Sequence, residues 1–392
     1  MAMKLLGAMV GMVLAGSVVA GAQEGPGVTK DEILFGSWTD LSGPLVSYGI
    51  PGVAGQSAYY KMLNDAGGVN GRKIRVITED HAYQPQRAVA AARKLVESDH
   101  VLAIQGVFGT IHSNAAFPYL LDQEKVPFIM PYAGSADWFA PNNPLIVSAM
   151  MPYDDHAVVL GRWAAKEGAK KILIIHNAIA NYEKVGKLAE PAAKAVDPDI
   201  AVEYMSVKLG TTDYAPIALE VIGKAPDAII SISTITELAA LAKELKQQNF
   251  TAKLYTYGGS VANDMIKLGG DAIEGLRAVS YTLPVDADHP AVQEYREALA
   301  KYEPSETPDY GSILTFALAK ITAEALRHAD EPLNRENLVQ AFYKLNDYDS
   351  GILGKVTLSP DQHLGVQTLQ RVEVNGGKFV AVGDFVAPHS DW

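Results

Sequence analysis

The sequence predicts an α/β protein built from two doubly wound, Rossmann-like lobes. First, residues Val101–Ile104 are apolar throughout, as in a strand buried on both faces, and a glycine-punctuated loop and a helix follow directly. Second, this alternation of strand and helix recurs along the chain and starts afresh near Met150–Asp155. Third, 392 residues exceed one typical hydrophobic core. We therefore expect two similar lobes joined by several crossovers, with a cleft between them.

The first lobe is predicted from four strands and the helices that connect them. Gly67 and Gly68 end the first helix by allowing a left-handed cap, and Pro85 suits the first turn of the second helix. Parallel strands in this order require right-handed crossovers. The strands are expected at 33–38, 74–79, 101–104 and 126–130, and the helices at 53–66, 85–95 and 113–123.

The second lobe repeats the pattern, and further helices and strands close the chain. Its helices are expected at 157–167, 185–196, 215–222 and 237–247, and its strands at 171–176, 202–207, 227–233 and 254–257. Helices at 290–302, 311–328 and 335–345 and strands at 354–358, 367–374 and 378–382 follow. We assign 31–151 plus 282–350 to the N-terminal lobe and 152–281 plus 351–385 to the C-terminal lobe, with hinge crossovers near 151–153, 280–283 and 350–354.

Residues 1–22 have the pattern of a cleaved signal peptide. Lys4 precedes the apolar run Leu5–Ala20, and Ala20-Gly21-Ala22 is a small-residue cleavage site. A membrane anchor is the alternative, but the run is shorter than the ~20 residues that a spanning helix needs. We expect cleavage after Ala22 and export, and no later stretch is apolar enough to span a bilayer.

The composition argues against several classes of function. A net charge of −12 disfavours nucleic acid and anionic membrane surfaces as partners. The lack of cysteine removes disulfides, thiolate metal sites and cysteine nucleophiles. No serine stands in Gly-x-Ser-x-Gly, no histidines show metal-ligand spacing, and no Gly-Lys-Ser/Thr phosphate loop is present. We expect no catalytic residues, no metal and no cofactor, although a doubly wound fold alone would permit an enzyme.

Four loops that follow predicted strands carry residues suited to recognition of a small molecule. Small residues expose backbone N–H groups, and the hydroxyls of Thr110 and Ser135 add donors, which together suit a carboxylate. Aromatic residues in the same loops favour an apolar or stacking wall. For any single loop, ordinary turn chemistry is the alternative. The loops are Leu41–Gly49, Phe108–Ser113, Pro131–Ser135 and Asn177–Tyr182.

Several motifs resemble one family. They are Leu-Ser-Gly-Pro…Tyr-Gly at 41–49, Asn-Asp-Ala-Gly-Gly-Val-Asn-Gly at 64–71, Glu-Asp at 79–80, Pro-x-x-Ala-Val-Ala-Ala-Ala-Arg-Lys-Leu-Val at 85–96 and Leu-Gly-Lys-Val-Thr-Leu at 353–358. With them the chain is similar to type I periplasmic substrate-binding proteins of ABC transporters, in the branched-chain amino-acid-binding class. The resemblance implies capture of a ligand between hinged lobes and delivery to an ABC permease, without chemistry. It further implies a periplasmic protein, which we expect to be monomeric.

The resemblance also implies the site residues. The carboxylate-binding loop falls on Phe108, Gly109 and Thr110, in a loop that is about two residues longer here. The second carboxylate loop falls on Ala133, Gly134 and Ser135, with Gly134 where a threonine is often found. The aromatic lids fall on Tyr48 and Tyr182, and the second lobe contributes Thr234, Gly258 and Gly259.

Position 258 departs from the family pattern. Amino-acid binders of this family carry an acidic residue about there, which pairs with the ligand's ammonium group, whereas this chain has Gly258-Gly259. A buried ammonium without a partner costs several kcal/mol. We therefore hypothesise an aromatic or other organic acid that lacks the amine. The alternatives are a branched-chain amino acid or small amide, with Asp40 or Glu183 as the replacement acid, and a ligand sensor with the same fold.

Overall fold

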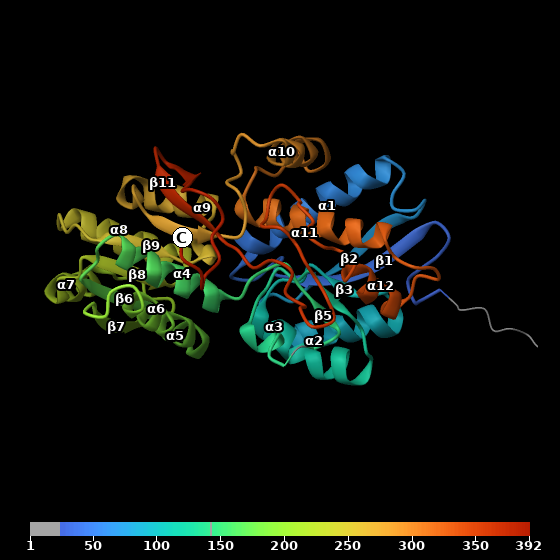
Figure 1. Ribbon diagram of the computed structural model, residues 1–392, viewed down its shortest axis with the longest axis horizontal. Coiled ribbons are helices and arrows are strands. Elements are labelled where there is room, and N and C mark those ends of the chain that lie inside the picture. The colour runs from blue at the N-terminus through green and yellow to red at the C-terminus, as the bar shows by residue number, and fades with distance from the viewer. Residues whose placement is uncertain (1–23, 142) are drawn as a thin grey trace, which may run out of the picture.

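The structure is a computed structural model that describes residues 24–141 and 143–392. Two α/β lobes lie side by side, each around its own sheet (Figure 1). The predicted fold class of two doubly wound lobes is thereby confirmed. The predicted signal peptide lies outside the described residues, and within those residues no helix combines the length and apolarity needed to cross a membrane.

The first lobe contains a five-stranded parallel sheet in the order β2-β1-β3-β4-β5. The first two strands pair along their whole length, whereas the other three are short. The predicted strand at 101–104 is regular only at its end, although Leu102 N already donates to Leu34 O at 2.9 Å. The strands are β1 (Glu32–Thr39), β2 (Lys73–Asp80), β3 (Ile104–Gln105), β4 (Phe128–Ile129) and β5 (Ile146–Val147).

Helices cover both faces of this sheet because side chains of a strand alternate between faces. Ile33 and Phe35 belong to the hydrophobic core under α1 (Val46–Asp65) and α11 (Tyr310–Arg327). Leu34 and Trp38 face the opposite core, under α2 and α3. Helices α10 and α12 complete the first face. Their bounds are α2 (Pro85–Arg93), α3 (Thr110–Phe117), α10 (Pro290–Tyr302) and α12 (Arg335–Phe342).

Several helices begin earlier than the sequence predicts, and in the first lobe the differences at α1 and α3 affect the site. Helix α1 begins at Val46 instead of 53, so Tyr48 lies in its first turn. Helix α3 begins at Thr110 instead of 113, directly after Gly109. Both helices therefore start at the carboxyl ends of strands, where the predicted site lies.

The second lobe contains a seven-stranded sheet in the order β12-β11-β10-β9-β8-β6-β7. Its five parallel strands, β7-β6-β8-β9-β10, have the same spatial order as the first sheet, and β11 and β12 extend it antiparallel. The strands are β6 (Lys171–Asn177), β7 (Ala201–Val207), β8 (Ala228–Ile232), β9 (Lys253–Thr256), β10 (Arg277–Ser280), β11 (Gln370–Asn375) and β12 (Lys378–Ala381).

The helices of the second lobe flank this sheet. The predicted helix at 185–196 is divided, because Pro191 cannot donate to the carbonyl of Lys187, where α5 ends. The helices are α4 (Tyr153–Lys166), α5 (Ala180–Lys187), α6 (Ala189–Lys194), α7 (Ala215–Lys224), α8 (Ile235–Gln247) and α9 (Asn263–Gly269).

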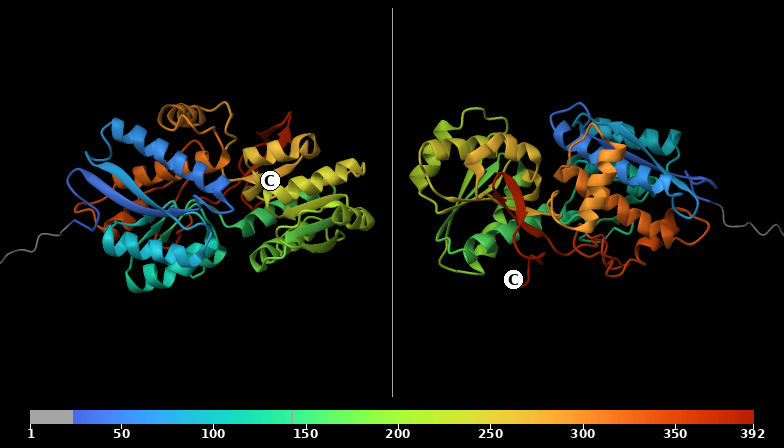
Figure 2. Two further views of the ribbon diagram at one scale, coloured as in Figure 1. Left: turned by 180° about the vertical axis from the view of Figure 1, so that it is seen from behind. Right: turned by 90° about the horizontal axis from the view of Figure 1, so that it is seen from above.

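Chain segments cross between the lobes after β5, after β10 and before β11 (Figures 1 and 2). The second crossing is paired with residues near 352, where Leu283 N donates to Ile352 O at 2.9 Å. The third crossing differs from the sequence assignment of 351–385 to the second lobe. Ser148 bonds to His363 and Gly365, which holds this stretch beside β5, so the chain reaches the second sheet only at β11. The predicted strand at 354–358 forms only an isolated antiparallel bridge, between Val356 and Tyr348.

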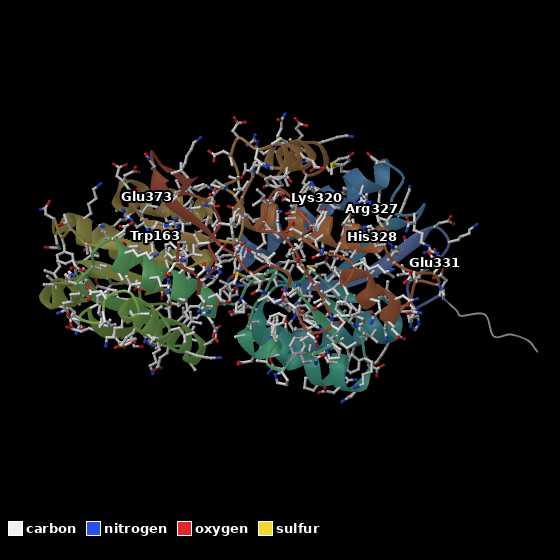
Figure 3. All side chains as sticks on the ribbon, in the orientation of Figure 1. Trp163, Lys320, Arg327, His328, Glu331 and Glu373 are labelled. Carbon is white, nitrogen blue, oxygen red and sulfur yellow. The ribbon has the colours of Figure 1, made fainter. Side chains whose placement is uncertain are left out.

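Ion pairs join elements within each lobe. In the second lobe Arg277 contacts Glu373 at 3.4 Å, between β10 and β11, and in the first lobe Lys320 contacts Glu294 at 2.5 Å, between α11 and α10. Figure 3 labels Glu373 and Lys320 on their separate lobes. An ion pair also joins the two lobes, where Lys184 of α5 contacts Asp137, after β4, at 3.2 Å.

Candidate ligand-binding site

Every predicted site residue lies beyond the carboxyl end of a parallel strand. Tyr48 follows β1, 108–110 follow β3 and 133–135 follow β4. In the second lobe Tyr182 follows β6, Thr234 follows β8 and 258–259 follow β9. Ligands of open α/β sheets bind at this edge, where the strand order reverses, here between β1 and β3 and between β6 and β8.

The loop after β3 presents free backbone donors. Gly109 has a φ of 103° and forms the N-cap of α3, a backbone conformation that favours glycine. Ser113 N donates to Gly109 O at 3.0 Å, and this is the first backbone hydrogen bond of the helix. The N–H groups of Thr110 and Ile111 therefore lack helical partners and suit an anion.

Two buried, stacked histidines support this loop from behind. His81 Nε2 donates to Phe108 O at 3.0 Å, while Tyr83 N donates to His81 Nδ1 at 2.9 Å. The ring of His112 lies 4.1 Å from that of His81, with 3° between their planes. Burial lowers the pKa of His112 to about 4 and also lowers that of His81. The hydrogen bond from His81 Nε2 thus fixes the position of the Phe108 carbonyl.

The loop after β4 lies directly beside the loop after β3. Tyr132 pairs with Phe108 in an isolated parallel bridge. Thr110 Oγ1 reaches Gly134 O at 3.4 Å, and Ala133, Gly134 and Ser135 are buried. The structure therefore brings together the two loops that the sequence predicts to bind a carboxylate.

Tyr48 connects the two lobes. Its ring stacks on Phe108, with 5.8 Å between centroids and 10° between planes. Its hydroxyl donates to Gly259 O of the second lobe at 2.7 Å. Asn263 N adds a second bond across the lobes, to Asp309 Oδ2 at 2.9 Å. Tyr48 and Gly259, predicted residues of different lobes, thus meet here.

Aromatic rings of the second lobe continue this contact zone. Tyr257 donates to the hydroxyl of Tyr182 at 3.1 Å, and its ring lies 5.6 Å from that of Tyr153. Burial raises the pKa of Tyr153, and the hydroxyls of Tyr182 and Tyr83 raise it further. Tyr153 therefore stands close to aromatic residues of both lobes, although the sequence analysis treats it only as part of a hinge.

His156 is a buried residue of this zone that the sequence analysis misses. Gly258 N donates to its Nδ1 at 3.0 Å, and its ring lies 4.4 Å from that of Tyr281. Burial lowers the pKa of His156 to about 3, so the imidazole is neutral and Nε2 carries its proton. Histidine is not unusual on a buried helical face, and only the fold reveals its neighbours.

Three tyrosine hydroxyls and one imidazole nitrogen are buried here without hydrogen-bond partners among the described residues. They belong to Tyr132, Tyr281, Tyr310 and His156 Nε2. Burial raises the pKa of all three tyrosines well above its usual value, so the hydroxyls are neutral. Each unpaired buried polar group costs about 1–3 kcal/mol. Such a set is typical of a site that a ligand or ordered water completes.

The acids proposed as replacements for a residue at 258 are already engaged. Asp40 accepts from Gly43 N at 2.7 Å and from Leu45 N at 2.6 Å. Glu183 pairs with Lys187 at 2.6 Å on the surface. Neither carboxylate is placed by these contacts to receive an ammonium group between the lobes.

The remaining predicted residue, Thr234, has a structural partner. It is the N-cap residue of α8, and its hydroxyl donates to Glu237 Oε2 at 2.9 Å. The same Glu237 accepts from Gly210 N at 2.8 Å. These bonds hold the loop after β8, and they give no contact between Thr234 and the aromatic residues described above.

A cavity of about 300 Å³ adjoins the aromatic residues on the hinge side. Tyr310 forms part of its wall, together with Ser280 and Thr282 on either side of Tyr281. Its other walls are Val261, Ala262, Asn263, Ile266, Lys267, Leu283, Pro284, Val285, Asp286, Val372, Gly377, Lys378 and Phe379. In the part of the chain that the structure describes, no group of three or more acidic or histidine side chains is arranged to hold a metal ion.

Comparisons with known proteins agree with this geometry. Residues 32–378 match the family model described as "Periplasmic binding protein". An "Amino acid binding protein" of Pseudomonas aeruginosa is 24% identical over 251 residues, which are 61% of this chain and 64% of that protein. The match thus spans slightly less than two thirds of that relative.

Solved structures share the fold over nearly the whole chain. A branched-chain amino acid ABC transporter protein from Thermus thermophilus, with bound valine, has a TM-score of 0.80 at 19% identity, covering 92% of this chain and 97% of that one. A fatty acid ABC transporter substrate-binding protein from Thermomonospora curvata has a TM-score of 0.79 at 23% identity, covering 94% and 95%. The chain therefore belongs to the periplasmic binding protein family, as a type I member of the group that contains the Leu/Ile/Val-binding proteins.

Proposed function

We propose that this protein captures a small carboxylic acid between its two lobes, and that an aromatic or other organic acid without an α-amino group is the preferred ligand. The observation that carries the proposal is the meeting of the adjoining loops after β3 and β4, the first of which offers N–H groups without helical partners, with a zone of neutral aromatic side chains. Tyr48 joins this zone to Gly259 of the other lobe.

The carboxylate would bind at the start of α3. The N–H groups of Thr110 and Ile111 offer donors there, and the positive end of the helix favours a negative charge. The hydroxyl of Ser135, in the adjoining loop, is a further donor. The aromatic residues would then contact the rest of the ligand.

An ammonium group has no evident partner at position 258. A Cβ atom on Gly258 would lie 2.7 Å from His156 Cε1 and 3.0 Å from Val279 O, so the imidazole fills the space that an acidic side chain would need. The buried carboxylate of Asp309, at the contact between the lobes, accepts from Gly311 N and Asn263 N and caps α11. These contacts favour an acid that lacks the amine.

The transport role follows from the family and the hinge. Lobe closure around the ligand, with higher affinity for the closed state, would present the loaded protein to an ABC permease. Residues 1–22 would direct export to the periplasm. The protein would act as a monomeric carrier, without catalysis or cofactor.

A matched pair of ligands tests the proposal. Leucine and 4-methylpentanoate differ only in the amine, and calorimetry with both, together with benzoate, measures its contribution. We expect the acids without the amine to bind at least as tightly as leucine. A clear preference for leucine would overturn the proposal and support a branched-chain amino acid, the second candidate, which the names of several relatives favour. Native mass spectrometry of the purified protein would identify any acid that it retains, and an altered product would indicate an enzyme.

A further inference from the structure

His156 places a fixed hydrogen-bond donor among the aromatic residues between the lobes. Gly258 N–H points at Nδ1 at 3.0 Å, so Nδ1 must accept and the proton of the neutral ring lies on Nε2. The side chain is fully buried, and Nε2 has no partner among the described residues. Because the hydrogen bond from Gly258 N–H holds the ring, the imidazole cannot flip to present an acceptor at the position of Nε2.

The surrounding hydroxyls extend this donor set toward the proposed carboxylate site. The ring of Tyr281 lies against His156, and the ring of Tyr310 lies 6.1 Å from Tyr281. Tyr132 directly precedes the loop 133–135, and its hydroxyl approaches Gly311, the neighbour of Tyr310. All three hydroxyls are buried and unpartnered among the described residues. The set therefore runs from the loop after β4 to the second lobe.

We propose that the ligand carries, besides its carboxylate, a second oxygen function that accepts a hydrogen bond from His156 Nε2 and contacts the hydroxyl of Tyr281. The inference rests on the function proposed above. A phenolic hydroxyl, a ketone or a second carboxylate would satisfy it, whereas an ammonium group would face a fixed donor. Tyr310, whose ring stacks on that of Tyr281, lines the cavity of about 300 Å³.

The experiment compares benzoate with its 3- and 4-hydroxy derivatives by calorimetry on the full mature chain. We expect at least one hydroxybenzoate to bind about tenfold or more tightly than benzoate, since a hydrogen bond to an otherwise unpaired buried donor has this effect. Equal binding of all three acids would overturn the inference while leaving the proposed function intact. If none of the acids binds, and leucine does, both proposals fail.

Variants of His156 separate recognition from folding. His156→Asn keeps an oxygen able to accept from Gly258 N–H but places no donor at the position of Nε2. We expect the preference for hydroxybenzoate to fall to near unity in His156→Asn and in Tyr281→Phe. Tyr204→Phe, whose hydroxyl bonds Glu190 on the edge strand β7, is the matched control and should keep the preference. A preference that persists in His156→Asn refutes the role of this residue.

A direct spectroscopic measurement does not depend on affinities. In a histidine-labelled sample, two-dimensional ¹⁵N spectra should show His156 as the Nε2–H tautomer without ligand. Hydroxybenzoate should shift the Nε2 resonance and benzoate should not. An Nδ1–H tautomer would overturn the inference, and it would do so even if the binding variants proved unstable.

Discussion

The neutral state of His156 makes a prediction about stability that needs no ligand. The folded protein holds this imidazole unprotonated down to about pH 3, because burial lowers its pKa from 6.5 to about 3. The unfolded chain binds the proton below pH 6.5. Stability is therefore lost as the pH falls from about 6.5 toward 3, and this loss stops below pH 3.

The size of the loss follows from the two pKa values. Between pH 6.5 and pH 4.5 the histidine is protonated in the unfolded state and neutral in the folded state. Over these roughly two pH units the free energy of unfolding falls by about 1.4 kcal/mol per unit. His156 should therefore account for roughly 3 kcal/mol of the fall in the free energy of unfolding. This is a large part of the stability of a typical domain.

Urea denaturation followed by tryptophan fluorescence at both pH values measures the effect. His156→Asn removes the titrating group. Between pH 7 and pH 4.5 the free energy of unfolding of this variant should therefore fall by roughly 3 kcal/mol less than that of the unchanged protein. His100→Asn, at an exposed position with positive φ that asparagine tolerates, is the control and should follow the unchanged protein. Parallel losses in His156→Asn and the unchanged protein would refute a buried neutral imidazole.

Three further substitutions test the site. Tyr48→Phe keeps the ring stack but removes the hydrogen bond to Gly259 O, which is worth about 1 kcal/mol. Calorimetry should therefore show roughly fivefold weaker ligand binding. An unchanged affinity would contradict a hydrogen bond that forms when the lobes close. Gly258→Asp should lower the urea midpoint because its Cβ meets His156, and His156→Ala should relieve that effect; simple additivity in the double-mutant cycle would contradict the collision. Gly109→Ala should destabilise the protein by ~1–3 kcal/mol and weaken the binding of carboxylates, because the φ of 103° at position 109 disfavours a side chain. A variant as stable as the wild type would exclude this strain.

Local sequence signals predicted the elements well where strands were long and helices amphipathic. The β1–β2 pair and α8 lie close to their predicted ranges. The short strands β3, β4 and β5 were harder to place, because two-residue pairing leaves almost no periodicity to detect. The course of 356–365 was misassigned, since pairing with Ser148 is a long-range choice that local pattern does not encode.

The loops of the site were predictable, and their neighbours were not. Glycines and small residues after buried strands marked 108–110 and 133–135, because the carboxyl edge of a parallel sheet is where such residues are used. His156, Tyr281 and Tyr310 carry no such local signal. They lie on helix starts or in a hinge, where buried aromatic residues usually serve packing.

By itself, the sequence determined the two-lobed α/β class, the acidic character and the position of the candidate loops, because alternation of buried strands with helices and turns is written locally along the chain. Only the tertiary structure decided which groups meet, both between the lobes and within the second lobe. Tyr48 reaches Gly259, and Gly258 N–H orients His156, across separations of more than 100 residues. Such contacts depend on how the sheets are placed by the whole core, and they set the polarity that a ligand would meet.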